Sequence, residues 1–277
     1  MRIAVVGSSG GMGSFFVGYF GARGHEVVRS DPVKRRQSVG TVARSNAEAA
    51  SGSDAVLLAV PLWKTLEVAR EVSGHMREGA LLVDISSVKE PLLPHLERLS
   101  RERGISLLSV HPLFGPSLRR TEGMKLAVIG SAGSRPLPLA RRLFPDAQLL
   151  PMTAEHHDRA MSVLLSLTHV TNMAYAAAAS RSIHPGRFRA LATPTASLQM
   201  TIAMSVLAQD PELYTHILFE NRHTRSALAD LSREVRRMEL LLARGDRKGF
   251  ERTFRRLREI YGRDKASIRR IYEALGV

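Results

Sequence analysis

The feature that most limits how this chain can fold is a glycine-rich turn close to its start. The run Gly7-Ser8-Ser9-Gly10-Gly11-Met12-Gly13 follows an apolar segment, residues 2–6, and opens a segment with helical spacing, residues 12–22. Glycine permits a tight turn from a buried strand into a helix, and the free N–H groups of a helix N-terminus favour a phosphate. This order predicts a dinucleotide site whose pyrophosphate contacts Gly7, Ser8, Ser9, Gly10, Gly11 and Met12.

The glycine spacing departs from the commonest fingerprint, G-x-G-x-x-G, because Ser8 stands where its first glycine would be. The alternative spacing of Gly7, Gly10 and Gly13 supplies the glycines that the turn needs. The competing interpretation is a strand, turn and helix that bind no ligand. An acidic residue further along the chain weighs against it.

That acidic residue is Asp31, which follows the second predicted strand, residues 26–29. A carboxylate here accepts hydrogen bonds from the adenosine ribose hydroxyls and repels a 2′-phosphate, so the cofactor we expect is NAD. Lys34, Arg35 and Arg36 follow at once and would attract a phosphate, which leaves NADP open. Asp31 precedes Pro32 and is also typical of a turn start; the two roles are compatible.

Apolar segments alternate with helical segments up to residue 151, which predicts a parallel sheet covered by helices on both faces. After residue 152 the strand signal ends and helical spacing continues to the end of the chain. We therefore predict an α/β dinucleotide-binding domain at residues 1–152 and an all-α domain at residues 153–277. The further predicted strands are residues 53–60, 80–86, 105–110, 125–130 and 147–151, and the predicted later helices are residues 154–181, 188–209, 211–243 and 248–275.

Length and composition narrow the class of protein. A chain of 277 residues that is 44% hydrophobic can bury one large core or two smaller ones. It has no cysteine, which excludes disulfides and thiolate metal sites, and we expect no metal. The longest apolar run, residues 160–179, is interrupted by serine, threonine, histidine and asparagine, so no membrane span is expected. The first residues enter a strand without a signal peptide, so we expect a cytoplasmic protein.

The formal net charge of +14 raises the question of nucleic-acid binding. More than half of the excess lies after residue 220, in a segment that also has helical apolar spacing. Its aromatic residues fall on the apolar face rather than among the basic residues. We therefore expect a solvated basic surface and no nucleic-acid partner, and the long amphipathic helices favour a homodimer. The apolar positions are Leu231, Val235, Met238, Leu242, Phe250, Phe254, Leu257 and Tyr261.

Polar residues follow three other predicted strands. In an open α/β sheet, ligands lie beyond the carboxyl ends of the strands. Val60, Pro61 and Thr65 should therefore line the ribose side of the cofactor, and Ser86 should also contact it. Ser87 and His111 should open on the same edge, near the nicotinamide. Histidine is the usual general base near neutral pH, so His111 is the candidate that would accept a hydroxyl proton during hydride transfer.

These segments together resemble the prephenate dehydrogenase family, which includes arogenate dehydrogenases. The resemblance rests on the glycine turn with Met12-Gly13, on Val60-Pro61 with Thr65, and on Ser87-Val88-Lys89. Its most specific part is His111-Pro112-Leu113-Phe114-Gly115-Pro116, which other dinucleotide-binding reductases have no reason to share. A weaker match is Ser166-Leu167-Thr168-His169, followed by Asp210-Pro211. The resemblance covers nearly the whole chain.

The resemblance implies a Rossmann domain followed by a helical dimerisation domain. It also implies oxidative decarboxylation of the small molecule prephenate to 4-hydroxyphenylpyruvate in tyrosine biosynthesis, with arogenate as the alternative substrate. His111 would accept or polarise the C4 hydroxyl proton, and Ser87 would hold the hydroxyl, His111 or the nicotinamide. His169 matches a substrate-pocket histidine, and Ser166 stands on the same helical face.

One departure concerns the substrate carboxylates. The family often has an arginine five residues before the Asp-Pro pair, and this chain has Ser205 there. Another cation should replace it, because prephenate carries two carboxylates. Arg222 is the candidate that we assign to substrate binding. Arg119 and Arg120 are further candidate cations, and Gln199 or Thr201 would add neutral hydrogen bonds.

Other interpretations remain at this point. A β-hydroxyacid dehydrogenase or an imine reductase has the same domain order but typically relies on a lysine in the helical domain or on a different loop. A dinucleotide sensor or a nucleic-acid-binding protein would use the basic tail. His156, His157 and Asp158 could indicate a metal, but adjacent histidines point to different helix faces, so we discount them.

Overall fold

The computed structural model describes residues 1–33, 39–131, 134–262 and 269. It contains two compact units. The first unit comprises Met1–Met161 and Glu212–Arg222, and the second comprises Ser162–Pro211 and His223–Val277. The units are groups of residues in mutual contact and do not define domains. The predicted domain boundary at residue 152 therefore stays a prediction. No helix in the described ranges is long and apolar enough to cross a membrane.

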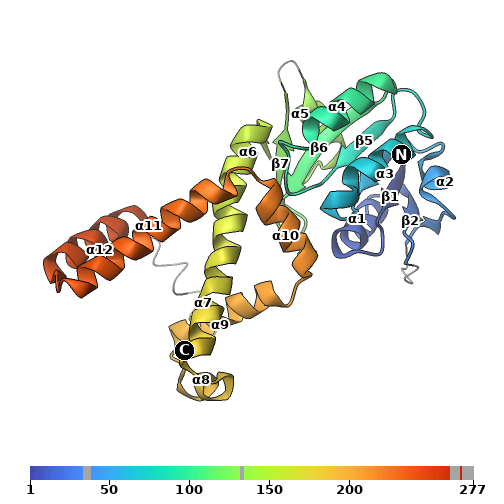
Figure 1. The fold of residues 1–277 in the computed structure, drawn as a ribbon. Helices are drawn as coiled ribbons and strands as arrows, with labels where there is room; N and C mark the ends of the chain where they lie inside the picture. Colours follow the sequence, from blue (N-terminus) through green and yellow to red (C-terminus); the bar gives the residue numbers. More distant parts are fainter. Residues whose placement is uncertain (34–38, 132–133, 263–268, 270–277) are drawn as a thin grey trace. The chain divides into compact units, whose positions relative to one another are not determined.

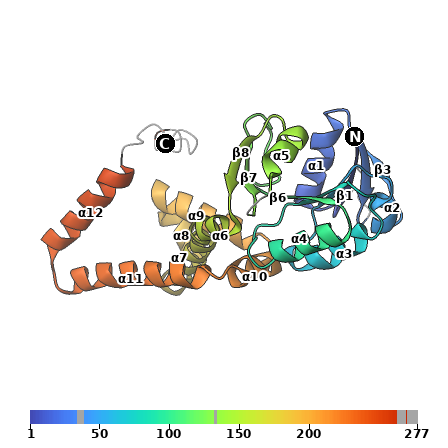
Figure 2. The same ribbon diagram turned by 90° about the horizontal axis from the view of Figure 1, so that it is seen from above.

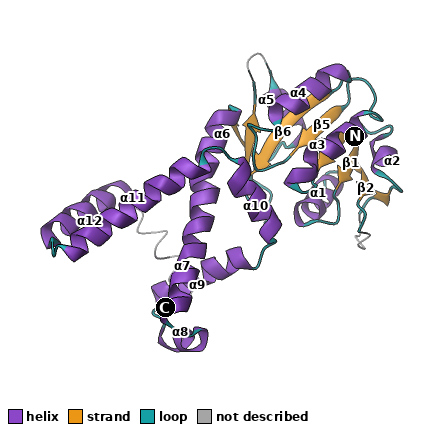
Figure 3. Ribbon diagram, viewed as in Figure 1, coloured by secondary structure: helices purple, strands orange, loops and turns teal. Residues whose placement is uncertain are grey.

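The first unit is built on a β-sheet, drawn in orange in Figure 3 and seen from the same side in Figure 1. The sheet has eight strands in the order β3-β2-β1-β4-β5-β6-β7-β8. Neighbouring strands are parallel except for β6 and β7, which are antiparallel. The parallel sheet that the sequence predicts is therefore confirmed, with one strand pair reversed. The strands are β1 Arg2–Val6, β2 Glu26–Ser30, β3 Thr41–Val42, β4 Ala55–Leu58, β5 Leu81–Asp84, β6 Ser106–Pro112, β7 Lys125–Ile129 and β8 Gln148–Met152.

Helices bury both faces of this sheet. Side chains alternate along β1, so Ile3 and Val5 join one core with Phe16 of α1, whereas Ala4 and Val6 join the opposite core. Two buried faces explain why a central strand such as β4 is continuously apolar. The helices of this unit are α1 Gly11–Gly21, α2 Asn46–Ala50, the 3₁₀ turn Leu62–Lys64, α3 Thr65–Ser73, α4 Leu93–Glu102, α5 Pro136–Leu143, α6 Ala154–Met161 and α10 Pro211–Glu220.

Helix α10 is remote in sequence from the rest of the first unit but packs within it. His216 stacks on Trp63, with 4.5 Å between ring centroids. Just after the helix, Asn221 donates a hydrogen bond from Nδ2 to the carbonyl oxygen of Asp158, at 2.7 Å. Arg222 forms an ion pair with Glu90, at 2.6 Å. These contacts hold the end of α10 against α6 and the segment after β5.

The second unit is helical, as the sequence predicts (Figure 2). Residues 154–181 are helical, but a π-helical turn, Ser162–Leu167, separates α6 from α7. The helices predicted at residues 188–209 and 211–243 are each divided, the first before Pro194 and the second at residues 221–223. The last helix ends at Tyr261, and the remainder of its predicted range, except residues 262 and 269, lies outside the described residues. The helices are α7 Thr168–Ser182, α8 Pro185–Leu191, α9 Pro194–Leu207, α11 Thr224–Ala243 and α12 Arg247–Tyr261.

Candidate active site

The glycine turn connects β1 to α1 and lies against the end of β4. Gly7 has a φ of +81°, and a Cβ there would overlap the carbonyl oxygen of Ala59. A Cβ at Gly13 would overlap the carbonyl oxygen of Gly7. The turn therefore requires glycine at both positions, whereas Gly10 has room for a methyl group, with its nearest neighbour at 3.4 Å.

Asp31 closes this turn from the neighbouring strand. Its Oδ2 accepts a hydrogen bond from the amide of Ser9 at 2.9 Å, and its Oδ1 accepts one from the amide of Val33 at 2.8 Å. The second bond is the Asp-Pro turn that the sequence predicts. The first places the carboxylate beside the glycine turn, where the ribose-binding acid of a dinucleotide site is found.

The start of α1 fits a pyrophosphate. Gly10 is its N-cap residue and supplies no side-chain cap, and the first turn carries no acidic residue. The first N–H groups of a helix have no partner within it, so the first turn of α1 offers donors to a phosphate. The residues present therefore fit a dinucleotide.

The segment after β4 is close to the turn through the contact of Ala59 with Gly7. Val60 is half-buried and Pro61 is exposed. Thr65 is buried, and its hydroxyl donates to the carbonyl oxygen of Pro61 at 3.4 Å. The Thr65 side chain thus holds the turn that begins α3.

The segment after β6 returns to the same edge of the sheet. The rings of Phe114 and Phe15 are 5.1 Å apart, and a Cβ at Gly11 would lie 2.9 Å from Cγ of Pro116. The motif that begins at His111 therefore packs directly on the first turn of α1. This contact brings the end of β6 and the glycine turn together.

His111 is the first member of a buried chain of hydrogen bonds. Its Nδ1 lies 2.9 Å from Nε2 of His157, and Nδ1 of His157 lies 2.6 Å from Oδ1 of Asp158. His111 is 7% exposed, and the other two residues are 0% exposed. His157 and Asp158 belong to α6, which thus meets the end of β6.

The acceptor at one end of this chain determines the tautomers. A carboxylate only accepts hydrogen bonds, so Nδ1 of His157 carries a proton. Nε2 of a neutral His157 is then an acceptor, so Nδ1 of His111 also carries a proton and donates it. Nε2 of a neutral His111 is left with a lone pair. The buried chain therefore prepares this nitrogen as a base.

A second buried group lies behind the histidines. Lys89 donates from Nζ to Oδ2 of Asp84 at 2.6 Å and to the carbonyl oxygen of Val110 at 2.7 Å. Its backbone amide and that of Glu90 donate to Asp158, at 2.8–3.1 Å. The segment after β5 is thus fastened both to β6 and to α6.

The two predicted serines of this segment differ. The Ser86 hydroxyl donates to the carbonyl oxygen of Val88 at 3.1 Å and accepts from Nζ of Lys89 at 3.3 Å. Within the described residues, the half-buried Ser87 has no hydrogen bond from its hydroxyl. Ser87 is therefore the serine whose hydroxyl is available to a ligand.

Burial and neighbouring charges set the protonation of these groups. Burial lowers the pKa of His111 well below that of an exposed histidine, and His157 and Lys89 act in the same direction. Burial also lowers the pKa of His157, against the opposing hydrogen bond to Asp158. Burial disfavours ionised Asp84, but Lys89 and the other hydrogen-bond donors outweigh it and lower the pKa of this carboxyl. The result is a neutral His111 beside a buried ion pair.

Two family models match the chain. The nucleotide-binding domain of prephenate dehydrogenase matches residues 26–131, and the dimerization domain of prephenate dehydrogenase matches residues 153–256. The chain belongs to the prephenate dehydrogenase family. This is a family of oxidoreductases, and its nucleotide-binding domain agrees with the fit of the glycine turn to a dinucleotide.

Individual relatives agree with this family. A probable arogenate/prephenate dehydrogenase of Methanocaldococcus jannaschii is 26% identical over 95% of this chain, which spans only 61% of that protein. A 4-amino-4-deoxyprephenate dehydrogenase of Streptomyces pristinaespiralis is 28% identical over 98% of this chain and 94% of its own length. The solved prephenate dehydrogenase from A. aeolicus, in complex with hydroxyphenyl propionate and NAD+, has a TM-score of 0.78 at 19% identity. That match covers 93% of this chain and 96% of the solved one, and it shows the shared fold.

The predicted substrate residues of the helical part lie within the second unit. The Ser166 hydroxyl is buried and lies 2.8 Å from the hydroxyl of Thr224. His169 is half-buried, and burial lowers its pKa. Within this unit, both residues belong to the segment that joins the π-helical turn to α7.

Some of the residues proposed to replace the family arginine already form an ion pair or a hydrogen bond within the protein. Arg222 is paired with Glu90. Gln199 donates to Asn172 at 2.8 Å, and Thr201 and Ser205 each donate to a carbonyl oxygen of their own helix. Arg119 and Arg120 are exposed.

Sequence reasoning missed the residues behind His111. In the sequence, His157 and Asp158 suggest only a metal site, whereas in the structure both are buried, His157 contacts His111, and Asp158 contacts His157. The signal that could have found them is the need of a general base for a partner that orients it. Lys89 stands out in the sequence only as part of the Ser87-Val88-Lys89 motif.

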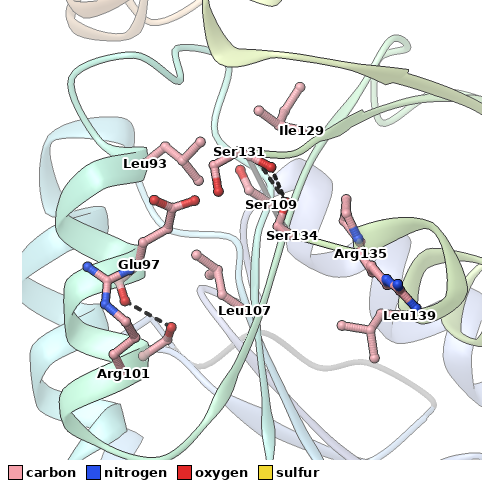
Figure 4. A pocket seen from close by; sticks show the side chains of 12 residues that line it. Leu93, Glu97, Arg101, Leu107, Ser109, Ile129, Ser131, Ser134, Arg135 and Leu139 are labelled. Atoms are coloured by element: carbon pink, nitrogen blue, oxygen red, sulfur yellow. Dashed lines mark hydrogen bonds between the residues drawn. The ribbon is translucent and has the colours of Figure 1, made fainter.

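A separate cavity of about 310 Å³ lies between α4 and α5 (Figure 4). Glu97 and Arg101 of α4 and Arg135 at the start of α5 line it, above the apolar side chains of Leu107 and Ile129. None of the predicted site residues lines this cavity.

Proposed function

We propose that this chain catalyses the NAD-dependent oxidative decarboxylation of prephenate to 4-hydroxyphenylpyruvate. The observation that supports this proposal best is the neutral His111, whose Nε2 is left with a lone pair. The loop that follows His111 packs on the glycine turn, and the chain belongs to the prephenate dehydrogenase family. A hydroxyl that is oxidised beside a nicotinamide needs a base of this kind.

In the proposed reaction, His111 accepts a proton, and the bonds that break and form lie in the substrate ring. Nε2 of His111 accepts the proton of the C4 hydroxyl while C4 loses a hydride. NAD+ bound at the glycine turn supplies the hydride acceptor. The bond from the ring to its carboxylate then breaks, CO₂ leaves, and the electron pair of that bond completes the aromatic ring. The proton on His111 is available to the phenolic oxygen.

The other residues hold this geometry. His157 and Asp158 fix the ring of His111 and face the positive charge that develops on it. The hydroxyl of Ser87 is available to the C4 hydroxyl, and Asp31 is placed for the ribose hydroxyls. Ser166, His169 and Arg222 are our candidates for contacts with the rest of the substrate, which carries two carboxylates.

A His157→Phe variant is the direct test of the buried chain. It keeps a ring of similar size but removes the acceptor for Nδ1 of His111, so the base loses its fixed tautomer. We expect kcat to fall by about 10- to 1,000-fold, a part of the 10²–10⁴ that a positioned base contributes. The matched control is His156→Phe, one residue earlier on α6 and exposed. Equal rates for the two variants would contradict the role of His157.

The substrate and the cofactor are tested together in one turnover assay. Prephenate, arogenate and 4-amino-4-deoxyprephenate are each combined with NAD+ and with NADP+, and reduced cofactor and CO₂ are measured. We expect prephenate with NAD+ to give the highest kcat/KM. Arogenate is the second candidate, because the M. jannaschii relative is named for both substrates. Turnover of a short hydroxyacid and of none of these three would overturn the proposal.

We also propose that the chain forms a homodimer through its helical unit. Large apolar side chains of α12 are exposed, with Phe254 at 62%, Ile260 at 60% and Tyr261 at 78%. Exposed apolar surface of this extent indicates a contact with another chain, and the matching family model is described as a dimerization domain. Sedimentation at micromolar concentration should give the mass of a dimer; a monomer would contradict this.

A further inference from the structure

Lys89 is a fully buried charged side chain whose role the proposed reaction does not explain. It is 0% exposed, and the three N–H donors of its ammonium meet three acceptor atoms of neighbouring residues. These are Oδ2 of Asp84 at 2.6 Å, the carbonyl oxygen of Val110 at 2.7 Å and the hydroxyl of Ser86 at 3.3 Å. The match between donors and acceptors indicates that the side chain is protonated.

The contacts of Lys89 converge on His111. The carbonyl that it holds belongs to Val110, so the ammonium fixes the peptide that leads into His111. Its own amide is held by Asp158, the carboxylate at the end of the histidine chain. Lys89 is thus connected to His111 in two ways: through the backbone of Val110 and through Asp158, which hydrogen-bonds to His157.

The partner of Lys89 is itself fixed. Asp84 accepts from the hydroxyl of Ser109 at 2.7 Å and from the amide of Ser86 at 2.9 Å. Ser109 is on β6, two residues before His111, so the ion pair joins the ends of two adjacent strands. Motion of the end of β6 would break charge-assisted hydrogen bonds in a buried site.

Stability alone does not account for such a pair. Each buried charge loses its hydration, and apolar replacements of a buried ion pair are often neutral or stabilising. Lys89 cannot deliver a proton to a substrate either, because it is buried and all three of its donors are engaged. An effect on the adjacent base remains.

We infer that Lys89 is a positioning residue for His111: its ammonium fixes the Val110 carbonyl and places a positive charge behind the histidine pair. This rests on the proposed function, in which His111 is the base. Lys89 acts through His111 and does not touch the substrate.

The charged and titratable groups around His111 come from three elements. Asp84 stands at the end of β5, Lys89 in the segment after it, and His157 and Asp158 on α6. On the other side, β7 places the apolar Ala127 opposite His111. Among these groups, Lys89 and His157 lower the pKa of His111, after burial. Removal of the Lys89 charge must therefore raise it.

The test compares Lys89→Met with the wild-type protein by ¹⁵N NMR of histidine side chains, without substrate. The resonances of His111 are assigned by their loss in His111→Asn. We expect His111 of the variant to take up a proton at higher pH than in the wild type. Because Lys89→Met leaves Asp84 buried without its cation, the double variant Asp84→Asn/Lys89→Met is measured as well. It removes both charges, and the shift should keep the same direction.

The control is Lys125→Met, which removes an exposed lysine from β7, the strand beside β6. Its His111 should titrate as in the wild type. If His111 titrates at the same pH in a folded Lys89 variant as in the wild type, the inference is wrong. An equal shift in the Lys125 control would also overturn it, because the effect would not depend on the position of the charge.

Kinetics then distinguishes this inference from the proposed function. In Lys89→Met, or in the double variant, the ratio of kcat at pH 6 to kcat at pH 8 should be lower than in the wild type, since a protonated base is inactive. A merely structural role would lower the rate equally at both pH values. If the wild type turns over none of the three substrates, the proposed function fails, and the NMR comparison still decides the role of Lys89.

Discussion

His111→Asn is expected to lose nearly all turnover while it still binds NAD+. The amide nitrogen of asparagine can replace Nδ1 of the ring as a donor to His157, but asparagine has no base in place of Nε2. Loss of a positioned general base lowers rates by about 10²–10⁴-fold, so we expect a fall in kcat of this size. Steady-state kinetics with prephenate measures it, and titration of NAD+ by calorimetry verifies that the cofactor site is intact. A rate within a few-fold of wild type would exclude His111 as the base.

The pH profile of the wild type tests the same residue. Burial, then His157 and Lys89, lower the pKa of His111 below its ordinary value of 6.5. A lowered pKa means that the ring stays neutral as the pH falls through 6.5 and is protonated only below its own, lower pKa. We therefore expect kcat/KM for prephenate to be constant through pH 6.5 and to decline at more acidic pH. A decline that begins well above pH 6.5 would contradict the neutral buried histidine.

Gly13→Ala should have the second large effect, on cofactor binding. Its methyl group would overlap the carbonyl oxygen of Gly7, so the turn has to open. Overpacking of this kind costs about 1–3 kcal/mol, which corresponds to about 5- to 150-fold in the Kd for NAD+. Calorimetric titration with NAD+ measures the change.

The matched control lies on the same helix. A Cβ at Gly18 would meet nothing within 4 Å, so Gly18→Ala should leave the Kd for NAD+ unchanged. It should also stabilise α1 by up to about 1 kcal/mol, because alanine favours a helix interior over glycine. Thermal unfolding reports this gain. Unchanged NAD+ affinity in Gly13→Ala would show that the turn does not bind the cofactor as proposed.

Most strands of the first unit could be predicted because they are largely apolar, and α1 because a glycine turn precedes it. Other elements give weaker signals. Thr41–Val42 is a two-residue strand with both side chains exposed, and α5 begins with prolines that resemble a loop in sequence. Proline is tolerated in the first turn of a helix, and Pro194 likewise begins α9 inside a range predicted as one helix. The reversal of β7 depends on tertiary packing and leaves no local pattern.

The candidate site also contains residues that could be predicted from the sequence and residues that could not. Gly7, Gly13 and Asp31 were predictable because a short segment carries the turn and its acid. The buried chain was not, because His157 is 46 residues from His111 and meets it only when α6 packs on the end of β6. The hydrogen bonds of the Ser86 hydroxyl to Val88 and Lys89 could not be predicted either, and its contact with the cofactor stays a prediction.

The position of Asp158 has a consequence for engineering. Its carboxylate holds the amides of Lys89 and Glu90 and also orients His157, and it lies after residue 152. A nucleotide-binding cassette cut at residue 152 would carry the glycine turn and His111 but leave the imidazole without the partners that select its tautomer. Chimeras that exchange helical domains within this family should therefore place their junction after α6 and retain the segment around Asn221, which also contacts Asp158. The module that binds the nucleotide and the module that prepares the base overlap along the chain.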